Sequence, residues 1–116
     1  MIVRQAAATL QSLARGYPIL AITGPRQSGK TTLAQSAFPD KPYVSLEDPD
    51  TRAFAQEDPR GFLGHWKDGA ILDEAQRCPA LFSYLQTRVD ANRRMAEFVL
   101  TGSQQFGLLS SITQTL

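Results

Sequence analysis

The chain has 116 residues, of which 42% are hydrophobic, so it is long enough and apolar enough to form one folded domain. Its net charge of +1 gives no electrostatic case for or against nucleic-acid binding. The single cysteine, Cys78, excludes an internal disulfide and a cysteine-based zinc cluster. No apolar run approaches the roughly 20 residues of a membrane span, and no secretory signal opens the chain. We therefore expect a cytoplasmic protein with no membrane partner.

The first half of the chain predicts two helices and two strands. Residues 2–15 carry apolar side chains at helical spacing, and Gly16 and Pro18 close this segment. Residues 19–22, Ile-Leu-Ala-Ile, are apolar on both faces, as in a buried parallel strand. Residues 30–37 predict a second helix, and residues 43–46 predict a second, shorter strand.

The segment from residue 47 to residue 66 is rich in Asp, Pro and Arg. Its pattern predicts one or two short helices. Asp48 or Asp50 is suited to be an N-cap, because a short carboxylate accepts hydrogen bonds from the first free N–H groups of a helix. Pro49 and Pro59 are suited to the first helical position.

The second half continues the alternation of strands and helices. Residues 70–72 predict a third apolar strand, and Pro79 opens a helix whose apolar residues recur every four positions. Residues 98–100 predict a fourth strand. From residue 104 onward, a helical pattern that reaches the end of the sequence carries Phe106, Leu109 and Ile112.

This alternation predicts an α/β fold with a parallel sheet. In such sheets, ligands bind beyond the carboxyl ends of the strands. Three of the four predicted strands end in unusual polar sequences, namely GPRQSGKT, DEAQ and TGSQ. We expect these sequences to meet at one edge of the sheet.

The sequence GPRQSGKT matches the phosphate-loop pattern G-x-x-x-x-G-K-[ST]. Gly24 and Gly29 permit the dihedral angles that let backbone N–H groups wrap a phosphate chain, and the helix that follows directs its free N–H groups toward it. Lys30 supplies a positive charge to the β and γ phosphates, and the Thr31 hydroxyl is an oxygen ligand for Mg²⁺. The expected phosphate-binding residues are Gly24, Pro25, Arg26, Gln27, Ser28, Gly29, Lys30, Thr31 and Thr32.

Two carboxylates follow the third strand directly. In a phosphate-loop enzyme, Asp73 would hold Mg²⁺ and Glu74 would polarise the attacking water. The alternative is a solvated pair at a helix start, since acidic residues are favoured in first turns. A base for water favours hydrolysis over phosphoryl transfer to a small molecule, for which no acceptor-binding signature is visible.

Small polar side chains end the fourth strand. A side chain placed there could hydrogen-bond the γ-phosphate or the attacking water, and so distinguish a diphosphate from a triphosphate. Ser103 is the first candidate for this catalytic role, followed by Thr101 and Gln104. The alternative is an ordinary turn in which Ser103 or Gln104 caps the last helix.

Other reactive or charged residues have simpler interpretations. We expect Cys78 to be a small, partly buried residue and His65 to pack at a helix end. Arg52, Arg60 and Arg77 are candidates for an arginine finger that serves a neighbouring subunit. Ion pairing with nearby Asp and Glu residues is the simpler expectation for all three.

Four segments together resemble the AAA-type ATPase domain of a large prokaryotic family. They are GPRQSGKTTL, YVSLEDPDTRAFAQEDPRGFL, AILDEAQRCPALFSYLQ and FVLTGSQQFGLLSSITQTL. The resemblance covers nearly the whole chain. It implies a three-layer P-loop NTPase fold with strand order 5-1-4-3-2, and an attached C-terminal domain that is uncharacterised and thought to be related to restriction-type nuclease folds.

The resemblance also implies ATP and Mg²⁺ as ligands and an ATPase activity that drives or regulates the attached module. It places catalytic roles on Lys30, Glu74 and Ser103 and the Mg²⁺ ligands at Thr31 and Asp73. ATP, the C-terminal domain and a second copy in a homo-oligomer are the expected partners. Nucleic acid is an alternative partner without support.

Such domains usually have a fifth strand, a helical lid and a basic residue shortly after the last helix. None is visible, so we expect a fragment truncated after the fourth strand, with an N-terminal helix over 1–16 and a P-loop core over 17–116. Without a fifth strand, residues 19–22 would lie at an exposed edge that invites aggregation. We expect weak ATP–Mg²⁺ binding and slow or absent hydrolysis.

Three other functions remain open. The chain could be a nucleotide-sensing module without turnover. It could be a helicase-like, nucleic-acid-dependent ATPase, since DEAQ is a helicase-type sequence, although a helicase core normally has two such domains and a basic track. It could also be a small-molecule kinase.

Overall fold

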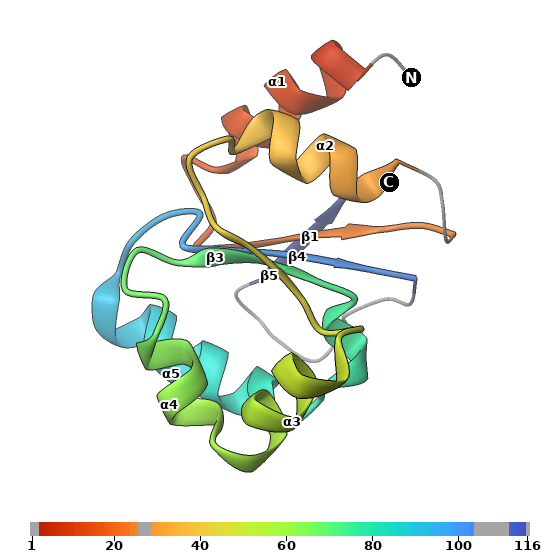
Figure 1. Ribbon diagram of the computed structural model, residues 1–116. Coiled ribbons are helices and arrows are strands. Elements are labelled where there is room, and N and C mark those ends of the chain that lie inside the picture. The colour runs from red at the N-terminus through yellow and green to blue at the C-terminus, as the bar shows by residue number, and fades with distance from the viewer. Residues whose placement is uncertain (1–2, 26–28, 104–111, 116) are drawn as a thin grey trace.

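Parallel strands form one sheet with helices packed on both of its faces (Figure 1). The computed structural model describes residues 3–25, 29–103 and 112–115. Within these residues the sheet has five strands in the order β2-β3-β4-β1-β5, and all neighbouring pairs are parallel. This three-layer arrangement confirms the predicted fold class. The strands are β1 (Ile19–Thr23), β2 (Tyr43–Ser45), β3 (Ala70–Asp73), β4 (Phe98–Gly102) and β5 (Ile112–Thr115).

The helices lie close to their predicted positions. The side chain of Asp48 accepts a hydrogen bond from the Thr51 N–H at 2.9 Å, so Asp48 is the N-cap of the helix that begins at Pro49. Pro59 begins the next helix, as predicted. Across the described ranges, no helix has the length and apolar character to cross a membrane. One face of the sheet carries α1 (Val3–Leu13) and α2 (Lys30–Ala37), and the other carries α3 (Pro49–Glu57), α4 (Pro59–Gly64) and α5 (Leu81–Asn92) (Figure 1).

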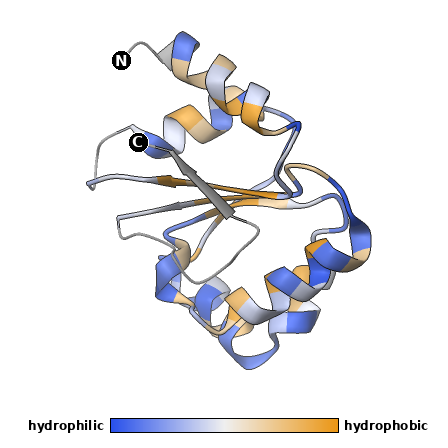
Figure 2. Cartoon of the chain, turned by 180° about the vertical axis from the view of Figure 1, so that it is seen from behind, coloured by the Kyte–Doolittle hydropathy of each residue, from blue (hydrophilic) through white to orange (hydrophobic). Residues whose placement is uncertain are grey.

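The sheet separates two apolar layers. β1 and β4 are buried along their whole length. Successive side chains of a strand point to opposite faces, so Leu20 and Ile71 pack toward α1 and α2, while Ala21 and Leu72 pack toward the other helices. Figure 2 shows hydrophobic residues concentrated on the central strands, whereas the helices mix hydrophobic and hydrophilic residues. The loops that follow β1, β3 and β4 therefore start from a buried, packed sheet.

Residues 112–115 form a strand, so the helix expected from residue 104 onward is wrong for these four residues. Residues 112–115 pair in parallel with residues 19–22 of β1. The segment Ile-Thr-Gln-Thr is rich in β-branched residues, which favour strands, and it pairs the backbone groups that β1 would otherwise expose. The fifth strand expected to be missing is thus present, and β1 lies inside the sheet. Phe106 and Leu109 lie outside the described residues.

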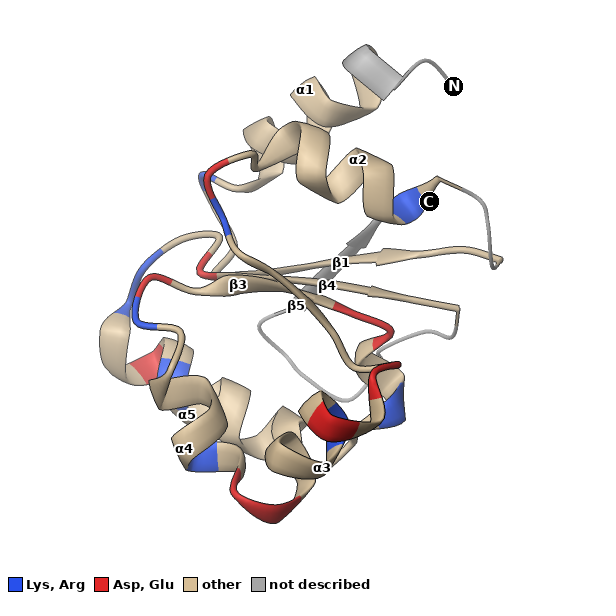
Figure 3. Ribbon diagram, in the orientation of Figure 1, with Lys and Arg blue, Asp and Glu red and all other residues tan. Residues whose placement is uncertain are grey.

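The strand order brings three segments to one edge of the sheet. β4 lies between β1 and β3, so the loop after β1, the turn after β3 and the tip of β4 are neighbours. The turn after β3 is a short 3-10 helix, η1 (Ala75–Arg77). At this edge, Figure 3 shows a basic residue at the start of α2 and acidic residues at the end of β3.

Candidate functional site

The loop after β1 ends at Gly29, whose backbone conformation favours glycine. Gly29 precedes α2 with φ 84° and ψ 9°, in the left-handed region where a side chain would be strained. The Gly24 N–H donates to the Gly102 carbonyl at 3.1 Å and fixes the loop against β4. Arg26, Gln27 and Ser28 lie outside the described residues.

Lys30 and Glu74 form a buried ion pair between the first turn of α2 and the end of β3. The distance from Lys30 Nζ to Glu74 Oε1 is 3.5 Å, and each residue is 4% exposed. Lys30 Nζ also donates to the Pro25 carbonyl at 3.3 Å. A buried charge pair of this kind is costly to break by removing one partner, because the other charge is left uncompensated. The pair ties the loop to the acidic strand end.

Hydroxyl groups from separate elements hold the Asp73 carboxylate. The Thr31 hydroxyl on α2 donates to Asp73 Oδ1 at 3.0 Å, and the buried Thr101 hydroxyl on β4 donates to the same oxygen. The Tyr43 hydroxyl on β2 donates to Oδ2 at 2.6 Å. Asp73 is itself only 8% exposed. Its carboxylate is therefore fixed in position beside the start of α2.

Glu74 has an unusual backbone conformation. With φ 54° and ψ 48°, it is a non-glycine residue in the left-handed region, which costs on the order of 1–3 kcal/mol. The Gln76 side-chain amide donates to Glu74 Oε2 at 2.5 Å and to Ser103 Oγ at 3.2 Å. The Gln76 Oε1 atom is buried and has no hydrogen-bond partner within the described part of the chain. Gln76 thus joins the carboxylate after β3 to the tip of β4.

The described site residues lie at one edge of the sheet, but they differ in burial and in whether they contact one another. Lys30, Thr31, Asp73 and Glu74 are in direct contact as pairs. Ser103 is exposed and reaches this group through Gln76. Pro25 and Thr32 are exposed. Thr101, the second candidate of the β4 tip, is buried against Asp73 instead, and Gln104 lies outside the described residues.

Sequence reasoning missed two residues of this cluster, Tyr43 and Gln76. Gln76 had a signal, because the sequence DEAQ places it two residues after Glu74, where a short turn brings the side chains together. Tyr43 had none, because its contact with Asp73 depends on the pairing of β2 with β3. Residues far apart in the chain need the topology to be known before their contact can be predicted.

The oxygen atoms around Asp73 fit Mg²⁺ better than a metal that needs many protein ligands. Within the described residues no group of three or more His, Cys, Asp or Glu side chains could hold a metal ion. The Thr31 hydroxyl and the Asp73 carboxylate offer hard oxygen ligands within 3.0 Å of each other. Mg²⁺ is typically held by one or two protein oxygens together with waters and phosphates.

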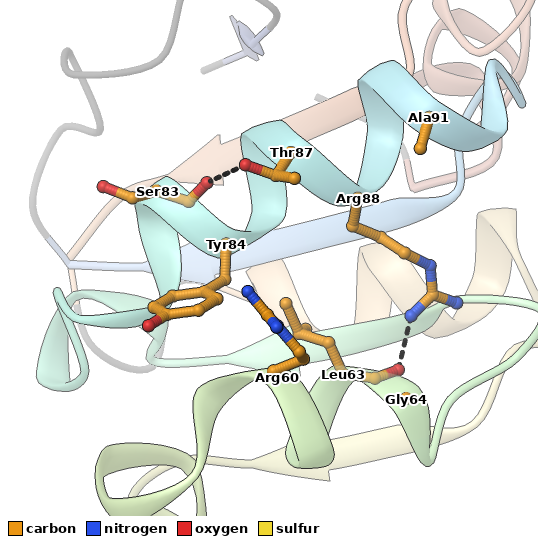
Figure 4. Close-up of a pocket in the computed structure, with 8 residues that line it drawn as sticks. All are labelled: Arg60, Leu63, Gly64, Ser83, Tyr84, Thr87, Arg88 and Ala91. Atoms are coloured by element: carbon orange, nitrogen blue, oxygen red, sulfur yellow. Dashed lines mark hydrogen bonds between the residues drawn. The ribbon is translucent and has the colours of Figure 1, made fainter.

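Two cavities are lined mainly by residues outside this cluster. One, of about 480 Å³, lies between α4 and α5, and Figure 4 shows Arg60 and Tyr84 at its wall. The other, of about 400 Å³, is lined by residues of β2, α3 and α4 and by His65 and Trp66. Lys30 and Asp73 line neither cavity, whereas Tyr43, which contacts Asp73, is among the residues that line the second.

The residues with simpler interpretations behave largely as expected. Cys78 is buried, which raises the pKa of its thiol, and His65 packs edge-on against Trp66 with ring centroids 4.8 Å apart. Among the described residues, two of the three arginines make contacts other than the expected ion pairs. Arg52 donates to main-chain carbonyl oxygens, and the guanidinium of Arg60 lies 6.0 Å from the centre of the Tyr84 ring.

The partly buried hydroxyl of Tyr43, bonded to Asp73, predicts a dependence of stability on alkaline pH. Burial, together with the hydrogen bond to Asp73, raises the pKa of Tyr43 from 10.0 to about 12. The folded state holds this proton more tightly, so the associated stability is fully present below about pH 10 and is lost as the pH rises toward about 12. The difference in Tm between wild type and Tyr43→Phe should be constant near neutral pH and shrink above about pH 10. A difference that grows with pH would contradict this assignment.

Comparison with known proteins gives relatives in sequence and in structure. A sequence model of a family described as an AAA domain matches residues 16–116. Uncharacterized proteins of Mycobacterium tuberculosis and Mycobacterium bovis are each 35% identical over 115 residues, which cover 97% of this chain and 26% of the relative. The chain thus spans about a quarter of the length of these curated relatives.

Solved structures share the fold at low sequence identity. PCH-2 of C. elegans is similar with a TM-score of 0.63 and 13% identity, over 97% of this chain and 42% of that chain. A DNA replication initiation factor is similar with a TM-score of 0.57 and 18% identity, over 95% of this chain and 39% of that chain.

Proposed function

The chain belongs to the AAA domain family, and from this premise we propose that it binds ATP with Mg²⁺ at the edge formed by β1, β3 and β4 and hydrolyses it. The observation that carries the proposal is the meeting of Lys30 with Glu74 and of Thr31 with Asp73 at that edge. A phosphate-loop sequence supplies one member of each pair and an acidic strand end supplies the other. This combination suits a magnesium-bound polyphosphate.

The binding step uses groups that are already in place. Lys30 leaves Glu74 and donates to the β and γ phosphates, and the N–H groups at the start of α2 face the same charge. Thr31 and Asp73 would hold Mg²⁺. When bound, Mg²⁺ neutralises charge on the phosphate oxygens. Phosphate compensates the charge of Lys30 for the loss of Glu74, while the Glu74 carboxylate keeps the hydrogen bond from Gln76.

In the proposed hydrolysis step, Glu74 is the base that activates water. Once Lys30 has moved to phosphate, Glu74 accepts a proton from water, whose oxygen bonds to the γ-phosphorus as the bond to the leaving ADP oxygen breaks. The buried Oε1 atom of Gln76 offers an acceptor for the second proton of that water. Ser103, which accepts a hydrogen bond from Gln76, would sense the γ-phosphate.

A second candidate is nucleotide sensing without turnover. Glu74 contacts Lys30 through one carboxylate oxygen and Gln76 through the other, so the proposed base is held in a resting state. We propose that nucleotide binding regulates a module attached to the domain, and the greater length of the curated relatives supports this.

The substitution Glu74→Gln separates binding from hydrolysis. We expect the variant to retain ATP affinity or increase it, because Lys30 is released from its ion pair, while phosphate release falls by about 100-fold or more. Fluorescent-nucleotide titration and a phosphate-release assay measure the two quantities. Glu57→Gln, the same change at an exposed residue of α3, is the matched control.

The outcomes distinguish the two candidates. Hydrolysis at the wild-type rate by Glu74→Gln would contradict the assignment of the base. Tight Mg²⁺-dependent binding by a wild type that releases no phosphate would favour the sensing module over the ATPase.

A further inference from the structure

Tyr43 approaches the Asp73 carboxylate from outside the phosphate loop and its neighbouring strands. It lies on β2, the strand at the edge of the sheet beyond β3, and is 42% exposed. Its hydroxyl nevertheless reaches Asp73 Oδ2 at 2.6 Å. The opposite carboxylate oxygen, Oδ1, accepts from Thr31 and Thr101. A surface residue thus holds one oxygen of a buried acid.

We propose that Tyr43 is a positioning residue that sets the affinity of Asp73 for Mg²⁺. This inference rests on the proposed function, since it needs Asp73 to hold the metal. Hydrogen bonds from outer residues orient the carboxylates that bind metals, and their removal typically lowers metal affinity by about 10- to 100-fold.

Metal binding would affect the hydrogen bonds from Thr31, Thr101 and Tyr43 to Asp73 differently. Thr31 is itself an expected metal ligand, so with Mg²⁺ bound its hydroxyl would no longer donate to Asp73. Thr101 and Tyr43 remain, one on each carboxylate oxygen, and together they define the plane and direction of the carboxylate. Without the Tyr43 hydroxyl, Oδ2 loses its 2.6 Å contact and the carboxylate can turn about its bond to Thr101.

The chemistry of the phenol suits this role. The hydroxyl is a neutral donor that holds the carboxylate without competing for the metal as a cation would. A tyrosine hydroxyl, with an ordinary pKa of about 10, is protonated and therefore a donor throughout the neutral range. Phenylalanine has the same shape without the donor, and the exposure of Tyr43 means that the apolar layers are not disturbed by the change.

The test is a Mg²⁺ titration of the protein with ADP or ATP, in wild type and Tyr43→Phe. We expect nucleotide affinity without Mg²⁺ to change by less than about twofold, and the Mg²⁺ concentration for half-saturation to rise by about 10- to 100-fold. Titration of Mn²⁺ into the protein–ADP complex, followed by electron paramagnetic resonance, measures metal binding without turnover. Tyr84→Phe is the matched control, because Tyr84 is 39% exposed and lies on α5.

Each result has a defined meaning. If Tyr43→Phe lowers the Tm but leaves the Mg²⁺ half-saturation unchanged, the hydroxyl is structural only and the inference is overturned. If nucleotide affinity falls equally with and without Mg²⁺, Tyr43 supports the nucleotide rather than the metal, and the inference is again overturned. If wild type shows no Mg²⁺-dependent nucleotide binding, the proposed function itself fails, and the inference fails with it.

Discussion

Replacing Lys30 with alanine is expected to weaken ATP binding by about 100-fold, because charged hydrogen bonds to phosphate contribute about 3 kcal/mol and each 1.4 kcal/mol is tenfold in affinity. Lys30 is only 4% exposed, and its ammonium lies 3.5 Å from Glu74 at the edge that the phosphates would occupy. Fluorescent-nucleotide titration measures the change. Lys67→Ala, at an exposed lysine in the turn between α4 and β3, should bind as wild type does.

A complication is that the alanine leaves Glu74 buried without its partner, which can destabilise the fold. The double substitution Lys30→Ala with Glu74→Gln removes both charges and restores a neutral pair. We expect the double variant to fold with near wild-type Tm and still to bind ATP weakly. Recovery of ATP affinity in the double variant would contradict a direct contact between Lys30 and phosphate.

Replacing Arg88 with methionine is expected to lower the free energy of unfolding by about 3–5 kcal/mol, the usual cost of leaving one charge of a buried pair alone. Arg88 Nε lies 3.0 Å from Glu97 Oε2, and Glu97 is 1% exposed. Arg88 also donates to the carbonyl oxygens of Leu63 and Trp66. It therefore fastens the end of α4 to α5, and Figure 4 shows its contact with Leu63.

The Arg88 effect has a matched control in the same chain. Arg94 Nη1 lies 3.1 Å from Asp68 Oδ1, but the two side chains are 49% and 93% exposed. Arg94→Met should therefore change the free energy of unfolding by less than about 1 kcal/mol. Urea denaturation of the two variants measures both values. Equal effects of the two substitutions would show that burial is not what makes the Arg88 pair important.

Much of the fold was predictable because local signals agreed with one another. The apolar segments of β1, β3 and β4 are continuous, as in strands covered on both faces, and Asp48, Pro49 and Pro59 mark helix starts by their own chemistry. A parallel sheet then brings the ends of these strands to one edge. The proximity of Lys30 to Glu74 follows from that rule, while their roles stay predictions.

The parts that could not be predicted depend on pairing between distant segments. Ile112 continues the helical spacing of Phe106 and Leu109 in the sequence, and pairing with the open edge of β1 decides in favour of a strand over residues 112–115. Because β1 pairs with β5, it is not the exposed, aggregation-prone edge that the sequence predicted. Tyr43 belongs to the same class, because its contact with Asp73 exists only when β2 lies beside β3.

The most direct test of the central proposal is the location of the metal–nucleotide complex on the chain. Mn²⁺ with ADP can be added to isotope-labelled protein, and the broadening of each amide resonance reports its distance from the paramagnetic ion. We expect the strongest broadening at Thr31, Asp73, Glu74 and Gly102, and its loss in Asp73→Asn. Broadening centred on the cavity between α4 and α5, or none with ADP present, would contradict a nucleotide site at the strand ends.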